Sequence, residues 1–191
     1  TRSLCDWSSD VCSSDLQAGP VFVAWDTLGE DTYRNRLWPG YQAGRVFESS
    51  IVDQLGLLPV ICEGFGFGVG KRSGYEADDL IASAVANATG PVLIYTTDKD
   101  AYQLVSESIT VLSPQRGSRV LDRVDPARVV ERLGILPQQV PDFKALAGDP
   151  SDGIPGARGI GPKSAASILL RHGTLEDALA GWPQEAAAQI R

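Results

Sequence analysis

Eight carboxylates in four short clusters constrain this chain more than any other feature of its sequence. One aspartate ends an apolar run, and the other acids stand in the motifs Gly-Tyr-Glu-Ala-Asp-Asp, Thr-Thr-Asp-Lys-Asp and Gly-Asp-Pro-Ser-Asp. The residues are Asp26, Glu76, Asp78, Asp79, Asp98, Asp100, Asp149 and Asp152. If they converge in the fold, their mutual repulsion requires neutralising cations. Oxygen ligands without paired histidines or cysteines favour Mg²⁺ or Mn²⁺ over Zn²⁺.

Any single one of these acids is equally well explained as a solvated surface residue. Two of the clusters, however, follow apolar runs of the kind that form buried strands of a parallel sheet. Residues 21–25 precede Asp26, and residues 91–95 lead to Asp98 and Asp100. Because open α/β sheets bind ligands at the carboxyl ends of their strands, we expect Asp26 and Asp98 to be neighbours.

A helix is predicted over residues 76–88, and one of the clusters lies at its amino-terminal end. Glu76 and Asp79 are three residues apart, so they share a face of this helix. The helix dipole favours acids at this end, which gives a structural explanation for one of them. It does not explain three acids within four residues.

A second kind of site is predicted at Gly159-Ile160-Gly161-Pro162-Lys163, a glycine hairpin that opens a helix over residues 162–171. Backbone N–H groups at such a helix start bind phosphate well. The alternative is a Gly-Pro helix start with a structural role only. From residue 141 onward the pattern consists of short helices, so we expect a small helical module after an α/β part.

The composition is compatible with binding to nucleic acid. A chain of 191 residues with 43% hydrophobic residues suits one medium domain, or a domain plus a small module. Its net charge is −7, but the remainder is mildly basic once the clustered acids are set aside, which predicts salt-sensitive contacts with a phosphate backbone. No apolar run approaches the length of about 18 residues that a membrane span needs.

Residues 5–16 resemble the translation of a common sequencing-library adapter and have neither helical nor strand periodicity. We interpret residues 1–16 as a foreign segment; the alternative is a genuine N-terminal extension. Without this segment only Cys62 remains of the three cysteines. No disulfide framework is then predicted, and a reducing, cytoplasmic location is expected.

The three acidic motifs and the glycine hairpin, in this order, resemble those of the flap endonuclease-like 5′ nucleases. The similarity covers about residues 21–180 and is closest to the 5′→3′ exonuclease domain of bacterial DNA polymerase I and its free-standing relatives. It implies an α/β fold: a PIN-like domain with a mostly parallel central sheet, followed by a helix-three-turn-helix module of the helix-hairpin-helix kind. These parts would be residues 17–140, lacking an N-terminal strand, and residues 141–191, incomplete at the C-terminus.

The resemblance implies a hydrolase that cuts DNA phosphodiesters near single-strand/duplex junctions in replication and repair, as a 5′→3′ exonuclease or flap endonuclease. Its substrate would be DNA with a flap, a nick or a 5′ single-stranded end. It would be fused to or work with a DNA polymerase, and no membrane is involved.

Roles for individual residues follow from the same resemblance. Two or more Mg²⁺ or Mn²⁺ ions would be held by Asp26, Glu76, Asp78, Asp98 and Asp100 at the first position and by Asp79, Asp149 and Asp152 at the second. The first five acids would be catalytic, together with two arginines in a segment similar to the family's helical gateway, Arg34 and Arg45. DNA would be bound by Tyr41, Gly159, Ile160, Gly161, Lys163 and Ser164, with K⁺ bridging the hairpin to DNA.

The sequence also departs from the family pattern. The family carries a further metal-binding aspartate on an N-terminal strand, and nothing before Val21 supplies one, so we expect the chain as written to be impaired or inactive. Gln42 stands where a lysine is common, and Gly153 stands where asparagine is usual. One alternative is a non-catalytic DNA-binding module. Another is an aspartyl phosphatase that uses Asp98 and Asp100, although that chemistry favours an Asp-x-Asp on the first strand.

Overall fold

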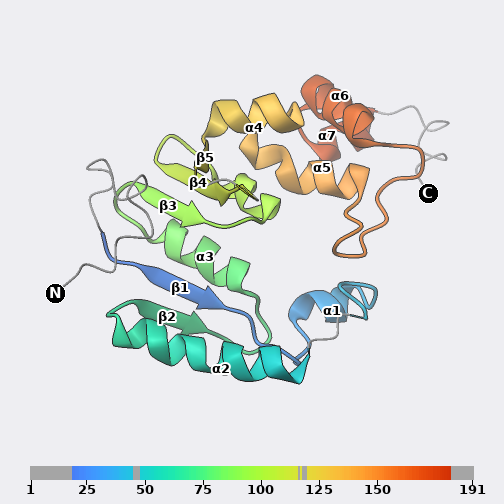
Figure 1. Ribbon diagram of the computed structural model, residues 1–191. Coiled ribbons are helices and arrows are strands. Elements are labelled where there is room, and N and C mark those ends of the chain that lie inside the picture. Colours follow the sequence, from blue (N-terminus) through green and yellow to red (C-terminus); the bar gives the residue numbers. More distant parts are fainter. Residues whose placement is uncertain (1–18, 45–47, 116, 118–119, 182–191) are drawn as a thin grey trace.

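The computed structural model describes residues 19–44, 48–115, 117 and 120–181. Two small sheets and their covering helices make up this part of the chain (Figure 1). In the first sheet β1 and β2 are parallel; in the second, β3 and β4 are parallel and β5 is antiparallel to β4. The strands are β1 (Phe22–Trp25), β2 (Gly68–Lys71), β3 (Val92–Tyr95), β4 (Ile109–Pro114) and β5 (Leu121–Val124).

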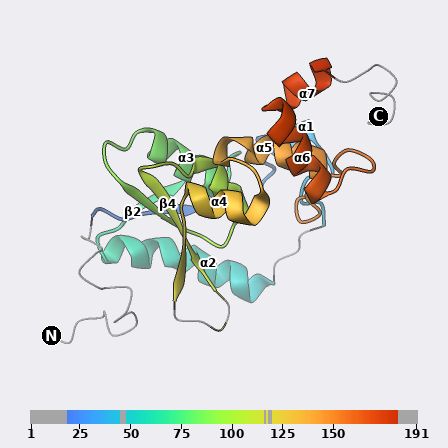
Figure 2. The same cartoon turned by 90° about the horizontal axis from the view of Figure 1, so that it is seen from above.

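Helices follow or connect these strands, and the C-terminal part is entirely helical. They are α1 (Tyr33–Leu37), α2 (Ser49–Gly64), α3 (Ala77–Ala86), α4 (Pro126–Leu133), α5 (Val140–Ala147), α6 (Pro162–His172) and α7 (Leu175–Gly181), with short 3₁₀ helices at Lys99–Leu104 and Pro137–Gln139. Figures 1 and 2 place α2 and the α6–α7 pair at opposite ends of the molecule. None of the described helices is long and apolar enough to cross a membrane.

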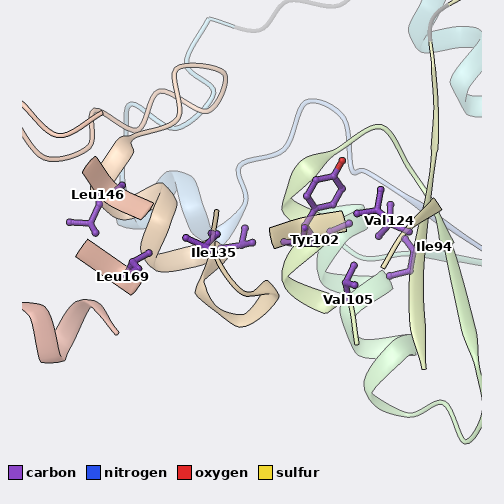
Figure 3. Packing of buried hydrophobic residues seen from close by; sticks show 12 residues of the cluster. Ile94, Tyr102, Val105, Val124, Ile135, Leu146 and Leu169 are labelled. Atoms are coloured by element: carbon purple, nitrogen blue, oxygen red, sulfur yellow. The ribbon is translucent and has the colours of Figure 1, made fainter. Parts of the chain in front are cut away.

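The hydrophobic core lies between the second sheet and the C-terminal helices (Figure 3). Val111 of β4, Val124 of β5, Val129 of α4 and Leu169 of α6 are each 0% exposed. Burying a Val or Leu side chain contributes about 1.5–3 kcal/mol, so this shared core stabilises the second sheet together with α4 and α6. By contrast, no residue of α2 is buried by the described part of the chain.

Local sequence signals explain where several helices begin and end. The Asp125 carboxylate accepts a hydrogen bond from the backbone N–H of Arg128 at 2.8 Å, which caps α4. At the other end Gly134 adopts a left-handed conformation with φ of 70°, which ends the helix. At the start of α3 the Asp79 carboxylate accepts from the backbone N–H of Glu76 at 3.0 Å. The acids of this motif therefore lie at a helix N-terminus, as expected from their spacing.

The strand β2 lies in a stretch whose composition does not predict a strand. The glycine-rich stretch 64–74 reads as a connector, because glycine is depleted in strands. The structure nevertheless places β2 there, parallel to β1. A Cβ at Gly70 would lie 2.4 Å from Cζ of Phe22, so the missing side chain is what lets the Phe22 ring pack over β2.

Part of the predicted domain organisation falls outside the described residues. This applies to the proposed foreign segment, residues 1–16, and to the end of the helical module, residues 182–191. The predicted absence of an N-terminal strand likewise stays a prediction. α5 begins at Val140 and contacts α6 as well as the 3₁₀ helix at Lys99–Leu104, and a domain boundary at residue 140 stays a prediction too.

Candidate active site

The first acid group consists of Asp26, Glu76, Asp78 and Asp79, which come from the end of β1 and the start of α3. The Asp26 carboxylate accepts a hydrogen bond from the backbone N–H of Ala77 at 2.7 Å. This bond joins residues 51 positions apart and fixes the carboxyl end of β1 against the N-terminus of α3. The acids of two distant motifs therefore share one place.

Arg34 and Tyr41 compensate part of this group. The Arg34 guanidinium donates two hydrogen bonds to Asp79, at 2.7 and 2.8 Å, and lies 3.7 Å from Oε2 of Glu76. The Tyr41 hydroxyl donates to Glu76 at 2.9 Å. Burial acts to raise the pKa of Asp79, but the bonds from Arg34 and from the Glu76 backbone outweigh it and lower that pKa. The pKa of Glu76 is raised by burial in spite of the bond from Tyr41.

The charge of Arg34 also acts on Asp78 but does not offset the other effects there. Burial, followed by the charges of Asp98, Asp26 and Glu76, raises the pKa of Asp78 to about 6. This shift connects the first acid group with Asp98, which follows β3, because charges must be close to act on one another in this way. The charges of Asp26 and Asp98 therefore both act on Asp78, and their direct contact stays a prediction. A bound divalent cation would reverse the shift by favouring the charged form.

The second acid group consists of Asp100, Asp149 and Asp152. One carboxylate oxygen from each lies within 4.8 Å of the others. The Lys144 ammonium contacts both Asp100 and Asp149, and the Asp149 carboxylate also accepts from the backbone N–H of Ser151 at 2.9 Å. Burial acts to raise the pKa of Asp149. The hydrogen bonds from Lys144 and Ser151 outweigh burial and lower that pKa to about 2.

A tight loop brings two of these acids back toward Asp100. The backbones of Asp149 and Ile154 exchange two hydrogen bonds, each of 2.8 Å, which closes the loop on itself. A Cβ at Gly156 would lie 2.4 Å from the backbone nitrogen of Gly148, so only glycine fits where the loop crosses its own start. The Gly-Asp-Pro-Ser-Asp motif thus owes its shape to glycines on either side of it.

A chain of hydrogen bonds joins the two acid groups. The Gln42 side-chain amide donates to the Tyr41 hydroxyl at 3.1 Å and to Asp152 at 2.9 Å, while Tyr41 in turn donates to Glu76. The backbone N–H of Gln42 also donates to the carbonyl of Asp152 at 3.1 Å. The segment after α1 is therefore held against the second acid group.

Sequence reasoning missed two of the residues that organise these groups. Gln42 was noted only as a departure from a pattern, and Lys144 was not singled out at all. Lys144 lies one turn before the end of α5, where its side chain reaches Asp149 five residues on and Asp100 much earlier in the chain. No local motif signals such contacts.

The remaining predicted residues are placed as follows. Arg45 lies outside the described residues. Tyr41, predicted to bind DNA, is only 8% exposed and directs its hydroxyl to Glu76. At the glycine hairpin Gly159, Gly161, Lys163 and Ser164 are exposed, while Ile160 packs against the core. A Cβ at Gly159 or Gly161 would meet nothing within 4 Å, so the first turn of α6 is open to an approaching anion.

Comparison with known proteins decides the family. A model described as the 5′-3′ exonuclease N-terminal resolvase-like domain matches residues 6–134, and one described as the 5′-3′ exonuclease C-terminal SAM fold matches residues 135–191. The chain belongs to the 5′-3′ exonuclease family. The resemblance drawn from the motifs is confirmed, together with the PIN-like α/β fold and its helical module. Because the first match includes residues 6–16, the foreign origin of that segment stays a prediction.

Relatives within the family include polymerases and a free-standing protein. DNA polymerase I of Mycobacterium tuberculosis is 41% identical over 162 residues, which is 81% of this chain but 18% of the polymerase. A 5′-3′ exonuclease of Streptomyces coelicolor is 38% identical over 188 residues, 91% of this chain and 62% of that protein. The chain thus spans less than a fifth of the polymerase and under two thirds of the exonuclease.

Solved structures share the fold. A mutant T5 5′-exonuclease superposes with a TM-score of 0.73 at 24% identity, covering 87% of this chain and 64% of that one. A T5 protein co-crystallized with metal ions gives the same TM-score and identity, covering 87% of this chain and 66% of that one. The arrangement of sheets and helices is therefore that of the T5 exonuclease.

Proposed function

We propose that the chain hydrolyses DNA phosphodiesters as a 5′→3′ exonuclease or flap endonuclease, acting next to a flap, a nick or a 5′ single-stranded end. The convergence of acids from four separate segments carries this proposal. Burial and the charges of Asp98, Asp26 and Glu76 raise the pKa of Asp78 to about 6. In the second acid group, one oxygen from each of three carboxylates lies within 4.8 Å of the others. A module that only binds DNA has no use for repulsion of this kind.

Divalent cations complete the proposal. The donor set is all oxygen, which suits Mg²⁺ or Mn²⁺, and Asp78, whose pKa is raised, is the kind of group that a cation neutralises. Two or more ions would be held by the first acid group with Asp98 and by the second acid group. When bound, such ions lower the pKa of water and stabilise the leaving oxygen of an in-line displacement. A relative co-crystallized with metal ions supports this assignment.

The protein's own groups then have distinct tasks. Arg34 holds Asp79 and Glu76 in place and adds positive charge beside the first acid group. The glycine hairpin, with Lys163 and Ser164, would bind phosphates of the uncut duplex, where K⁺ is also expected. The hairpin reads backbone shape, so no sequence preference is expected there. Partnership with a polymerase and a cytoplasmic location complete the proposal, and relatives named DNA polymerase I support the former.

The test is single-turnover cleavage of a 5′-labelled flap substrate by excess protein, in Mg²⁺ and in EDTA. Excess protein is needed because the chain as written is expected to be impaired or inactive. We expect cleavage in Mg²⁺ that is abolished by EDTA and by Asp100→Asn. Glu107→Gln, which removes an exposed acid away from both groups, serves as the matched control and should cleave normally.

Binding of the flap substrate without cleavage in Mg²⁺ or Mn²⁺, both by the chain as written and by a version carrying an N-terminal strand that ends in aspartate, would contradict the proposal and favour a non-catalytic DNA-binding module. Calorimetric titration with Mn²⁺ also distinguishes a nuclease from a DNA-binding module. A nuclease should have an Mn²⁺ site that Asp100→Asn removes, and a module that only binds DNA should have none. A version carrying an N-terminal strand that ends in aspartate should cleave faster than the chain as written. Equal rates would refute the predicted impairment.

A further inference from the structure

A cavity of about 480 Å³ lies where β5 and α4 are in contact (Figure 1). Its volume is within the range of about 300–1,000 Å³ that is usual for small-ligand sites. It shares no lining residue with the two acid groups or the glycine hairpin. Its charged lining consists of Asp122, Arg123, Arg128 and Arg132. Three guanidinium groups against one carboxylate make the cavity positive in a chain whose net charge is −7, so its ligand should be an anion.

Two of these arginines are fixed by the protein itself. Arg128 and Arg132 are four residues apart, so they share one face of α4. The Asp122 carboxylate contacts Arg132 and lies 3.6 Å from Nε of Arg128. Arg132 also donates to the Tyr102 hydroxyl at 2.7 Å, and Tyr102 is only 2% exposed. Because both guanidinium groups are already ordered, a ligand loses little affinity to immobilising them.

Hydrogen-bond donors remain for a ligand on the other side of the cavity. Arg128 donates to Glu131 through Nη1 at 2.6 Å, and its Nη2 meets no acceptor in the described part of the chain. Arg123 is exposed and forms no ion pair with any described residue. A solvated surface explains one such arginine. It does not explain three around one cavity, two of them held in place by the acid between them.

The geometry of these donors favours a phosphate group over a carboxylate. A guanidinium offers its N–H groups as a planar fork that matches two oxygens of one anion. Arg123 belongs to β5 and Arg128 to α4, so the two forks reach the cavity from different elements. The two oxygens of a carboxylate lie in one plane and are satisfied by one fork. A tetrahedral phosphate presents oxygens to both.

We propose that this cavity binds a phosphate group, with Arg123 and Arg128 as its donors and with Arg132 fixing the site to the core through Tyr102. The phosphate is carried by the DNA backbone or by a small phosphorylated molecule, and its oxygens are recognised in the same way in both. As a contact with DNA the site rests on the proposed function. As an anion site it does not depend on hydrolysis.

The first measurement is calorimetric titration of the whole chain with inorganic phosphate, at low salt and in EDTA so that no divalent cation takes part. Arg123→Gln and Arg128→Gln should each lower the phosphate affinity about tenfold, because each removes charged hydrogen bonds. Arg123→Lys should recover little, since an ammonium lacks the planar fork. Arg171→Gln removes an exposed arginine near the end of α6 and is the matched control, which should bind phosphate normally.

The glycine hairpin is also expected to bind phosphate, so Lys163→Met is measured beside these variants. Loss of phosphate binding in Lys163→Met, with normal affinity in both arginine variants, would place the anion at the hairpin and overturn the proposal for free phosphate and DNA alike unless the DNA measurement below shows the predicted change. Arg123→Gln removes no described contact, so its stability in urea should be unchanged. A loss of binding in that variant is then not a loss of folding.

The second measurement identifies the source of the phosphate. Affinity for flap DNA is measured in Ca²⁺ at several salt concentrations, with a gel control for cleavage. A contact with one backbone phosphate predicts that Arg123→Gln weakens DNA binding and reduces the slope of log K against log salt by about 0.9. An unchanged slope together with lowered affinity for inorganic phosphate assigns the site to a small phosphorylated molecule. Normal binding of both phosphate and DNA by the two arginine variants would overturn the proposal.

These outcomes are separate from those for hydrolysis. The titrations in EDTA and Ca²⁺ require no cleavage, so their failure would overturn the phosphate site alone. Absence of cleavage in Mg²⁺, together with the predicted losses in the arginine variants, would overturn the proposed function and leave the phosphate site established.

Discussion

The two acid groups carry similar charge but compensate it differently. In the first, Arg34 binds Asp79 through two hydrogen bonds, and its charge offsets only part of the raised pKa of Asp78. In the second, Lys144 contacts Asp100 and Asp149 together. A metal ion therefore meets a carboxyl with a raised pKa in the first group, and a tethered ammonium in the second. The same type of ligand can thus be prepared for a cation in two ways.

The largest effect expected is the loss of cleavage when either group is broken. Asp78→Asn and Asp100→Asn should each lower the single-turnover rate by more than about a hundredfold, because each removes charge stabilisation that the reaction requires. Similar losses would show that both groups take part. A full rate for one variant would restrict the reaction to the other group, and Glu107→Gln again serves as the control.

Arg34→Ala should have the next largest effect. It leaves Asp79 and Glu76 without their cation, which should reduce stability by about 2 kcal/mol and slow cleavage more than it weakens DNA binding. Arg34→Lys should recover little, because an ammonium cannot reproduce two parallel hydrogen bonds. Urea denaturation and cleavage rates measure both effects. Full recovery by lysine would mean that only the charge of Arg34 matters.

Lys144→Met should act in the opposite direction on metal binding. Removing the tethered ammonium leaves Asp100 and Asp149 free for a divalent ion, so Mn²⁺ affinity at the second acid group should rise about tenfold, the change expected from about 1.4 kcal/mol of lost competition. Calorimetry measures it directly. Lys163→Met removes a similar charge at the glycine hairpin and should leave Mn²⁺ affinity unchanged. A fall in affinity in Lys144→Met would mean that the ammonium holds the acids in a shape the ion needs.

The smallest effects are opposite slopes of stability with pH in EDTA. Asp78 has a pKa of about 6 in the folded chain and about 4 when unfolded, so the folded state binds more protons and loses stability as pH rises from about 4 to 6. Asp149 has a folded pKa of about 2, so its contribution is present above pH 4 and is lost as pH falls toward 2. Urea denaturation of Asp78→Asn and Asp149→Asn should each remove one slope. A single slope shared by both variants would show that the groups titrate as one.

Much of this arrangement could be predicted from local sequence. Asp26 and Asp98 follow apolar runs, Asp79 begins a helix, and Gly134 ends one, all of which depend on neighbours along the chain. β2 was not predicted because glycines are typical of loops. Only the fold shows that the ring of Phe22 packs over these glycines. The contact of Gln42 with Asp152 spans 110 residues and has no local pattern. The partners that compensate the charge of the acids are therefore visible only in the folded structure.

The close approach at Gly153 has a consequence for protein engineering. With φ of 71°, a Cβ at this position would lie 2.4 Å from the carbonyl oxygen of Gly40. Asparagine, which is usual at this position in the family, tolerates this backbone conformation. Its Cβ can be accommodated only if the backbone around Gly40 shifts away. A chimaera that borrows one short motif from a relative would push these segments apart. Grafts into this chain must exchange residues 38–42 and 149–154 as one block.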